Sequence, residues 1–243
     1  MTEQRRVFPF SLVIGVAFAL TLSPSPGQQS PSPHPIQQLL SDSGGAIPSE
    51  DDLKPFIGSA SAQEAVRQVL STSKHAEFWS SGVISLAAIS NLDGPQGLKE
   101  RDRLIQFMES LEPFGCSVNC QSLPANSYPK LVRWDHEARL KVPIALGYLL
   151  RNTNPRQEAQ ISDLINTLSE IGKGVLINRV LCVAQNRVDE SCAQTLQLNA
   201  VRGLELSGKH GAEAALDRII ANNPNPLVSR EAEIAKRSYS HHQ

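Results

Sequence analysis

Two amphipathic helical signals follow each other in the last third of the chain, and they constrain its fold more than any other feature. Apolar residues recur with a 3.6-residue period over 193–204 and again over 212–220, and Ser207-Gly208 separates the two runs. A short helix cannot bury its apolar stripe alone, so such a pair must stack against similar pairs. The pattern therefore predicts an all-α protein built as an α-α superhelix, which is a helical solenoid.

Other parts of the chain carry helical signals as well. Apolar stripes predict helices within 65–69, 79–87, 98–111, 138–150, 161–171, 176–184 and 226–235. Ser49-x-x-Asp52 has the form of a capping box, and Asn154-Pro155 is expected to open the helix that contains Ile161. Pro143 lies inside a predicted helix and is expected to kink it.

Short segments of similar sequence recur at near-constant spacing. One set is Asp102-Arg103-Leu104-Ile105, Asp163-Leu164-Ile165 and Asp217-Arg218-Ile219-Ile220, the last beginning 115 positions after the first. The preceding helices recur as Ser85–Ser90, Pro143–Tyr148 and Asn199–Leu204, which begin 58 and then 56 residues apart. The spacing predicts three repeat units.

These segments resemble the HEAT-repeat family over about residues 76 to 237. The resemblance is carried by 225–232 (NPLVSREA), which is similar to the Pro-x-Val-Arg-x-x-Ala opening of the family's first helix, by 145–149 (ALGYL) and by 199–204 (NAVRGL). It implies stacked helix pairs whose second helices line an extended groove that binds a protein segment. The bilin-lyase-like relatives imply an alternative, which is an enzyme or cofactor-attachment factor on the same scaffold.

The repeat differs from the family pattern in two ways. Its units are about 57 residues long, whereas a typical unit has about 40 to 47. Ser229 also adds one residue between the expected Val and Arg. We therefore expect an irregular HEAT-like stack with inserted loops.

The N-terminus has the pattern of an export signal. Arg5 and Arg6 precede an apolar stretch over 7–22, and Ser25-Pro26-Gly27 offers small residues for cleavage after Gly27. An uncleaved membrane anchor is the alternative interpretation, but the stretch of 16 residues falls short of the ~20 that span a bilayer. Contact with a membrane is expected only through this segment. A periplasmic or secreted protein is predicted.

Composition and pattern together divide the chain. We expect a disordered signal peptide at 1–27, a disordered Ser/Pro-rich linker at 28–48, a HEAT-like domain at 49–237 and a frayed tail at 238–243. Removal of 1–27 leaves 21 basic and 23 acidic residues, a net charge of about −2. Strong general affinity for nucleic acid is therefore not expected.

The four cysteines form an even set in a compartment expected to be oxidising, which favours disulfides. Three pairings are possible. We favour the local pairs Cys116 with Cys120 and Cys182 with Cys192, because each flanks a loop-like stretch. Four thiolates around zinc is the alternative, although the spacings do not match the usual short pairs.

Two near-matches to catalytic motifs each lack a required residue. Gly203-x4-Gly208-Lys209-His210 lacks the Ser or Thr of a phosphate-binding loop, so Gly208 is better interpreted as a helix-terminating glycine. His136-Glu137 begins a zinc-protease pattern, but Leu140 replaces the second His. We expect no catalytic residue set, cofactor or metal.

The sequence favours a binding or assembly module in the bacterial envelope over an enzyme. Its partner is expected to be a protein, and Arg133, Trp134 and His136 are the candidate binding residues, because Trp134 lies among charged side chains. The alternatives are a bilin-lyase-like or metal-dependent enzyme on a HEAT-like scaffold and a structural envelope component.

Overall fold

The computed structural model describes residues 32–90, 99, 101–104, 106, 128–175, 182–184, 187–209 and 211–240. The chain divides into two units, 1–32 and 33–243, and the fold described below is that of the second unit. Helices dominate it, and its described strands are two residues long each. The all-α prediction is therefore confirmed for the described part of the chain.

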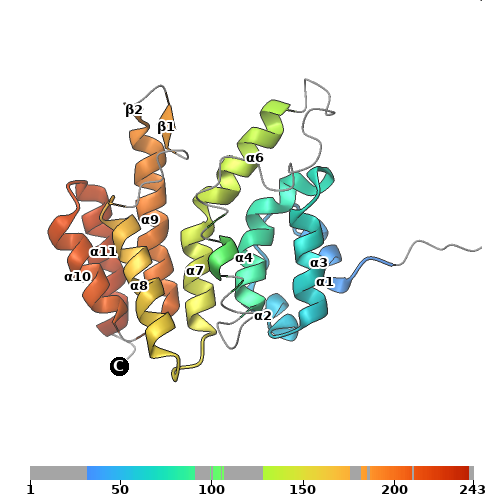
Figure 1. The fold of residues 1–243 in the computed structure, drawn as a ribbon, viewed down its shortest axis with the longest axis horizontal. Helices are drawn as coiled ribbons and strands as arrows, with labels where there is room; N and C mark the ends of the chain where they lie inside the picture. The colour runs from blue at the N-terminus through green and yellow to red at the C-terminus, as the bar shows by residue number, and fades with distance from the viewer. Residues whose placement is uncertain are drawn as a thin grey trace, which may run out of the picture. The chain divides into compact units, whose positions relative to one another are not determined.

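The elements follow the order shown in Figure 1. The first half contains α1 (Pro35–Asp42), α2 (Glu50–Leu53), η1 (Lys54–Phe56), α3 (Ala60–Leu70), η2 (Ser73–Phe78) and α4 (Trp79–Ile89), and residues 101–104 are helical. The second half contains α6 (Tyr128–Leu140), α7 (Val142–Arg151), α8 (Glu158–Gly172), β1 (Val183–Ala184), β2 (Arg187–Val188), α9 (Glu190–Ser207), α10 (Ala212–Asn222) and α11 (Pro226–Ser240).

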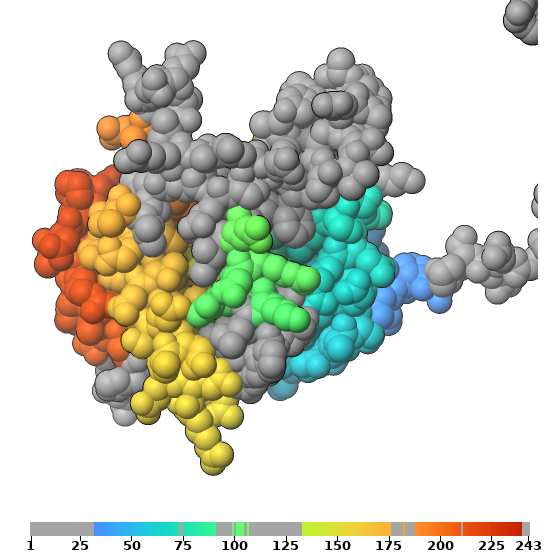
Figure 2. All heavy atoms as spheres, in the orientation of Figure 1, coloured from blue at the N-terminus to red at the C-terminus, as the bar shows by residue number. Residues whose placement is uncertain are grey.

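Most of the helices from α4 onward pack in two rows. In one row α4 contacts α7, α7 contacts α9, and α9 contacts α11. In the other row α8 contacts α10, and α8 also packs on α9. Arg101 extends this second row, because its Nη1 donates to Asp163 Oδ2 on α8 over 2.7 Å. Figure 2 shows residues 101–104 in green beside α8 in yellow.

The core follows the apolar stripes of the sequence. Leu104, Leu164 and Ile219, which occupy matching positions in the three similar segments, are all buried in one cluster. Trp79 is also fully buried there, as are nearly all residues of α4. Burial of these stripes supplies the main free energy of folding, at roughly 25 cal/mol per Å² of apolar surface.

Helices α7 and α9 approach each other at the backbone. A Cβ atom added to Gly147 would lie 2.3 Å from the Gly203 carbonyl oxygen, and one added to Gly203 would lie 2.3 Å from that of Pro143. The two glycines therefore permit a helix contact that no larger residue allows. Pro143 is the second residue of α7, and Lys141 separates this helix from α6, so the predicted kink is a break between two helices.

The linker assignment does not hold for residues 35–42, which form α1. His34 and Gln37 make a capping box, and Ile36 and Leu40 are buried against the core. The Gln37 side-chain amide donates to the Ala65 carbonyl oxygen on α3 over 3.1 Å. The helical domain therefore begins before residue 49, because two buried aliphatic side chains offset the cost of ordering this short segment.

The frayed tail predicted at 238–243 also begins too early in the chain. Helix α11 continues to Ser240, and Tyr239 packs against the core, so residues 238–240 belong to the domain. Residues 241–243 lie outside the described part of the chain, as do residues 1–27 of the expected signal peptide and residues 28–31 of the linker.

A hairpin replaces the end of the helix predicted at 176–184. Val183 pairs with Val188 in antiparallel register, and residues 176–181 are outside the described part. The disulfide between Cys182 and Cys192 joins this hairpin to the first turn of α9 and is one of the two predicted local pairs. Cys116 and Cys120 are not among the described residues.

Loss of this disulfide should lower the free energy of unfolding by about 2 to 3 kcal/mol, because it closes a short loop. The paired variant Cys182→Ser with Cys192→Ser should therefore melt below the wild type in thermal denaturation. Reduction should lower the melting temperature of the wild type by more than that of the variant, in which only Cys116 and Cys120 remain to be reduced. Equal melting temperatures for oxidised and reduced wild type would contradict a stabilising role.

Within the described residues, no helix combines the length and the apolar character that crossing a bilayer requires.

Candidate functional site

Three adjoining hollows lie where helix ends meet. The Tyr239 hollow has a volume of about 950 Å³ and is lined by Arg151, Glu205, Leu206, Gly208, Lys209, Gly211, Glu213, Ala214, Ser238 and Tyr239. The α8–α10 groove measures about 770 Å³ and is lined by Pro155, Glu158, Ile161, Ser162, Ile165, Asn166, Gly208, Lys209, Gly211, Ala214 and Arg218. The Tyr148 pocket measures about 260 Å³ and is lined by Glu50, Asp51, Leu53, Lys54, Ile57, Ala88, Tyr148, Arg151 and Asn152.

The three hollows share residues at their borders. Gly208, Lys209, Gly211 and Ala214 line both the Tyr239 hollow and the α8–α10 groove, and Arg151 lines both the Tyr239 hollow and the Tyr148 pocket. They therefore adjoin one another, and we call the three together the connected hollows.

The turn between α9 and α10 forms the border between the Tyr239 hollow and the groove. Gly208 ends α9 with a φ of +57°, and Gly211 precedes α10 with a φ of +99°. Both values lie in the left-handed region, which glycine adopts without a steric cost. The prediction that Gly208 terminates a helix is confirmed.

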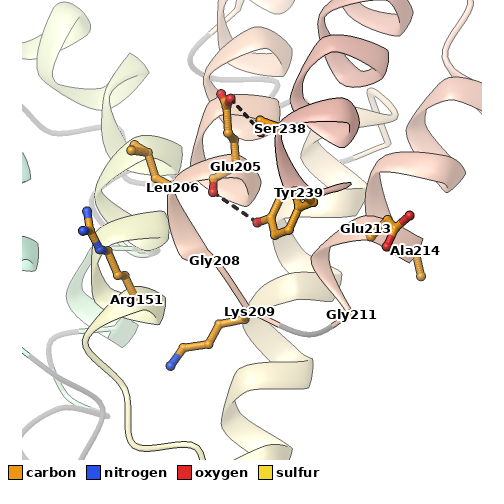
Figure 3. Close-up of a pocket in the computed structure, with 10 residues that line it drawn as sticks. All are labelled: Arg151, Glu205, Leu206, Gly208, Lys209, Gly211, Glu213, Ala214, Ser238 and Tyr239. Atoms are coloured by element: carbon orange, nitrogen blue, oxygen red, sulfur yellow. Dashed lines mark hydrogen bonds between the residues drawn. The ribbon is translucent and has the colours of Figure 1, made fainter. Parts of the chain in front are cut away.

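Lys209 connects this turn to the turn that follows α7. Its Nζ donates to the carbonyl oxygen of Thr153 over 2.7 Å, and Thr153 is buried. A charged donor makes this a strong hydrogen bond. The contact holds the ammonium group of Lys209 near the border of the two hollows, and Figure 3 shows this side chain below that of Arg151.

Tyr239 from α11 forms one wall of its hollow. Its hydroxyl is within hydrogen-bonding distance of the Leu204 and Glu205 carbonyl oxygens, and burial raises the pKa of its phenol above the usual value. The neighbouring Ser238 hydroxyl donates to Glu205 Oε1 over 3.2 Å. These contacts attach the end of α11 to the end of α9, so the wall is built from two helices.

Arg151 separates the Tyr239 hollow from the Tyr148 pocket. Its Nη1 donates to Glu50 Oε1 over 2.5 Å, which links α7 to α2. Tyr148 lies in the pocket beside this ion pair. Burial raises the pKa of its phenol, the charge of Glu50 raises it further, and Arg151 opposes the shift.

The α8–α10 groove combines an apolar floor with polar walls. Ile161 and Ile165 of α8 are buried beneath it, while Ser162 and Ala214 are exposed. Arg218 reaches from α10 to α8, where its Nη2 donates to Asn166 Oδ1 over 3.2 Å. An apolar surface with a few fixed polar groups is the usual composition of a binding site.

The binding residues predicted from the sequence lie elsewhere, on α6. Arg133 is 77% exposed at its side chain and forms an ion pair with Glu137 over 2.8 Å. Trp134 is only partly exposed because it packs against the core, and His136 is also partly exposed. None of the three lines the connected hollows.

The sequence interpretation did not single out Arg151, Arg218 or Tyr239. Lys209 was considered only as part of an incomplete phosphate-binding loop. The pair Gly208 and Gly211 was the available signal, because two glycines three positions apart between helical stripes indicate a tight turn. Thr153, the partner of Lys209, lies 56 residues away in the chain, so the sequence does not reveal this contact.

No group of three or more His, Cys, Asp or Glu side chains placed to hold a metal ion occurs among the described residues. Comparison with protein-family models, curated proteins and solved structures found no match for this chain.

Proposed function

We propose that this protein is an exported helical-repeat binding or assembly module that holds a segment of a protein partner in the connected hollows. The observation that carries the proposal is that these hollows adjoin one another at Arg151 and at Lys209. An extended segment needs a long surface with apolar contacts and fixed polar groups, and this surface offers both.

A HEAT-like solenoid is the architecture that we propose for the domain. The series α4, α7, α9 and α11 corresponds to the first helices of successive pairs, and residues 101–104, α8 and α10 correspond to the second helices. The spacing of the similar sequence segments supports the same assignment. In this arrangement the α8–α10 groove lies between two neighbouring second helices.

Export to the periplasm or the cell exterior is part of the proposal. Two observations support it, namely the signal-like pattern of residues 1–27 and the disulfide between Cys182 and Cys192.

Selection of displayed peptides on the full-length chain tests the binding function. Ala214 is exposed and lines both larger hollows, so Ala214→Trp should obstruct them without disturbing the core. Ala221 is the matched control, because it is exposed on the same helix about 10 Å farther along and lines none of the hollows.

Random peptides of about twelve residues should yield binders whose affinity, measured by fluorescence anisotropy, falls about tenfold or more in Ala214→Trp, which corresponds to about 1.4 kcal/mol. Ala221→Trp should retain the affinity of the wild type. Failure to select any binder, or equal affinity for the two tryptophan variants, would count against the connected hollows as the binding surface.

A further inference from the structure

Arg218 is held in the α8–α10 groove by neutral groups. Its Nη2 donates to Asn166 Oδ1 over 3.2 Å, and its Nε donates to the hydroxyl of Ser169 over 3.4 Å. Ser169 is 1% exposed, so one of the two acceptors is part of the core of α8. The guanidinium group is therefore oriented across the groove before any ligand arrives.

The charge of Arg218 has no acidic partner in the described part of the chain. The neighbouring acid Asp217 accepts from Lys236 Nζ over 2.7 Å, and Asp163 of α8 accepts from Arg101. Arg218 forms no ion pair with any described carboxylate, and its Nη1 has no described partner. An arginine fork presents donors that match a carboxylate.

The rest of the groove sets a second requirement for its ligand. Ile161 and Ile165 form the floor, and they are 9% and 5% exposed. Lys209 and Arg218 outnumber Glu158 among the charged lining residues, so the groove carries a net positive charge. An apolar surface beside a positive charge favours a peptide segment that is both apolar and acidic.

We propose that the α8–α10 groove selects a partner segment in which an acidic side chain binds Arg218 and a nearby aliphatic or aromatic side chain packs over Ile161 and Ile165. This inference rests on the proposed binding function and specifies the chemistry of its ligand. The two hydrogen bonds to α8 restrict the Arg218 side chain in the free protein, which lowers the entropy lost when an acidic side chain binds it.

The test is a parallel selection of one random library of twelve-residue displayed peptides on three full-length proteins. These are the wild type, Arg218→Gln and the control Arg230→Gln, which removes an exposed arginine of α11 that lines none of the hollows. Sequencing of the selected pools gives the frequency of Asp and Glu relative to the starting library. Thermal melts of the three proteins confirm that each is folded.

We expect the wild-type and Arg230→Gln pools to be enriched in Asp or Glu a few positions from an aliphatic or aromatic residue. The Arg218→Gln pool should lose that enrichment. A synthetic peptide from the wild-type pool should bind about tenfold more weakly when its acid is replaced by the amide, and Arg218→Gln should remove this difference.

Four outcomes would overturn the inference. Wild-type pools without acidic enrichment would do so while leaving the binding function intact, provided that Ala214→Trp still lowers the affinity of the selected peptides about tenfold or more. If the pool selected on Arg218→Gln is still enriched in Asp or Glu, the acidic side chain of the peptide binds a cation other than Arg218. A wild-type dimer in light scattering that Arg218→Gln dissociates would identify a second copy of this chain as the occupant. If no peptide is enriched, the proposed function fails together with the inference.

Discussion

Gly203→Ala is expected to lower the free energy of unfolding by about 2 to 3 kcal/mol, although alanine favours helix formation by about 1 kcal/mol over glycine. The added methyl group would lie 2.3 Å from the Pro143 carbonyl oxygen, and that atom belongs to the backbone of α7. Relief of this overlap requires α7 and α9 to move apart, which removes packing along both helices.

Gly172→Ala is the control for this prediction. Its added methyl group would meet the end of the Ile219 side chain at 2.4 Å, and a terminal methyl can move by rotation about a side-chain bond. Chemical denaturation of both variants should show the larger loss for Gly203→Ala. A Gly203→Ala protein as stable as the wild type would show that the two helices do not approach at the backbone.

Leu216→Asp is expected to unfold the domain. Leu216 is fully buried on α10, so the substitution places a carboxylate without a partner in the apolar core. The cost is several kcal/mol, comparable with the roughly 5 to 15 kcal/mol that hold a domain folded. Circular dichroism should show loss of helix at temperatures at which the wild type is folded.

Glu213→Ala is the matched control on the same helix. Glu213 is about half exposed, and its ion pair with Lys236 spans 3.8 Å at the surface. Surface pairs of this kind contribute less than about 1 kcal/mol. Similar melting curves for Leu216→Asp and Glu213→Ala would contradict the assignment of the buried face of α10.

The sequence predicts the elements whose apolar stripes decide their structure. Leu164, Leu168 and Ile171 of α8 follow the helical period, and all three are buried as expected. The boundaries are less predictable because several side chains can cap a helix. Asn154 was expected to open α8, yet its side chain accepts from the backbone of Arg156 within the turn and the helix begins at Glu158.

Tertiary contacts explain the structure of the segments that were predicted wrongly from the sequence. Residues 35–42 form a helix too short to be stable alone, and α1 forms because it packs on α3 with Ile36 and Leu40 buried. Residues 183–184 pair with residues 187–188 in antiparallel register, and the Asp189 amide donates to the Cys182 carbonyl oxygen over 2.6 Å. A pattern of apolar residues alone does not predict such a reversal of the chain direction.

The candidate site was beyond sequence reasoning for a related reason. Trp134 was favoured because its neighbours in sequence are charged, but the core lies beneath it in space. Arg151, Lys209 and Arg218 come from three separate segments, and each was an ordinary surface cation in the sequence. Only the fold brings these three side chains together around the connected hollows.

The backbone contact between Gly147 and Gly203 has a mechanical consequence. Two helices that touch at their backbones cannot slide or tilt without separating, so α7 and α9 should move together as one rigid body. The neighbouring junctions, α4 with α7 and α9 with α11, carry no such glycine pair among the described residues and can yield by side-chain rearrangement. Bending of the stack around a ligand is therefore expected at its two flanks, with its centre remaining rigid.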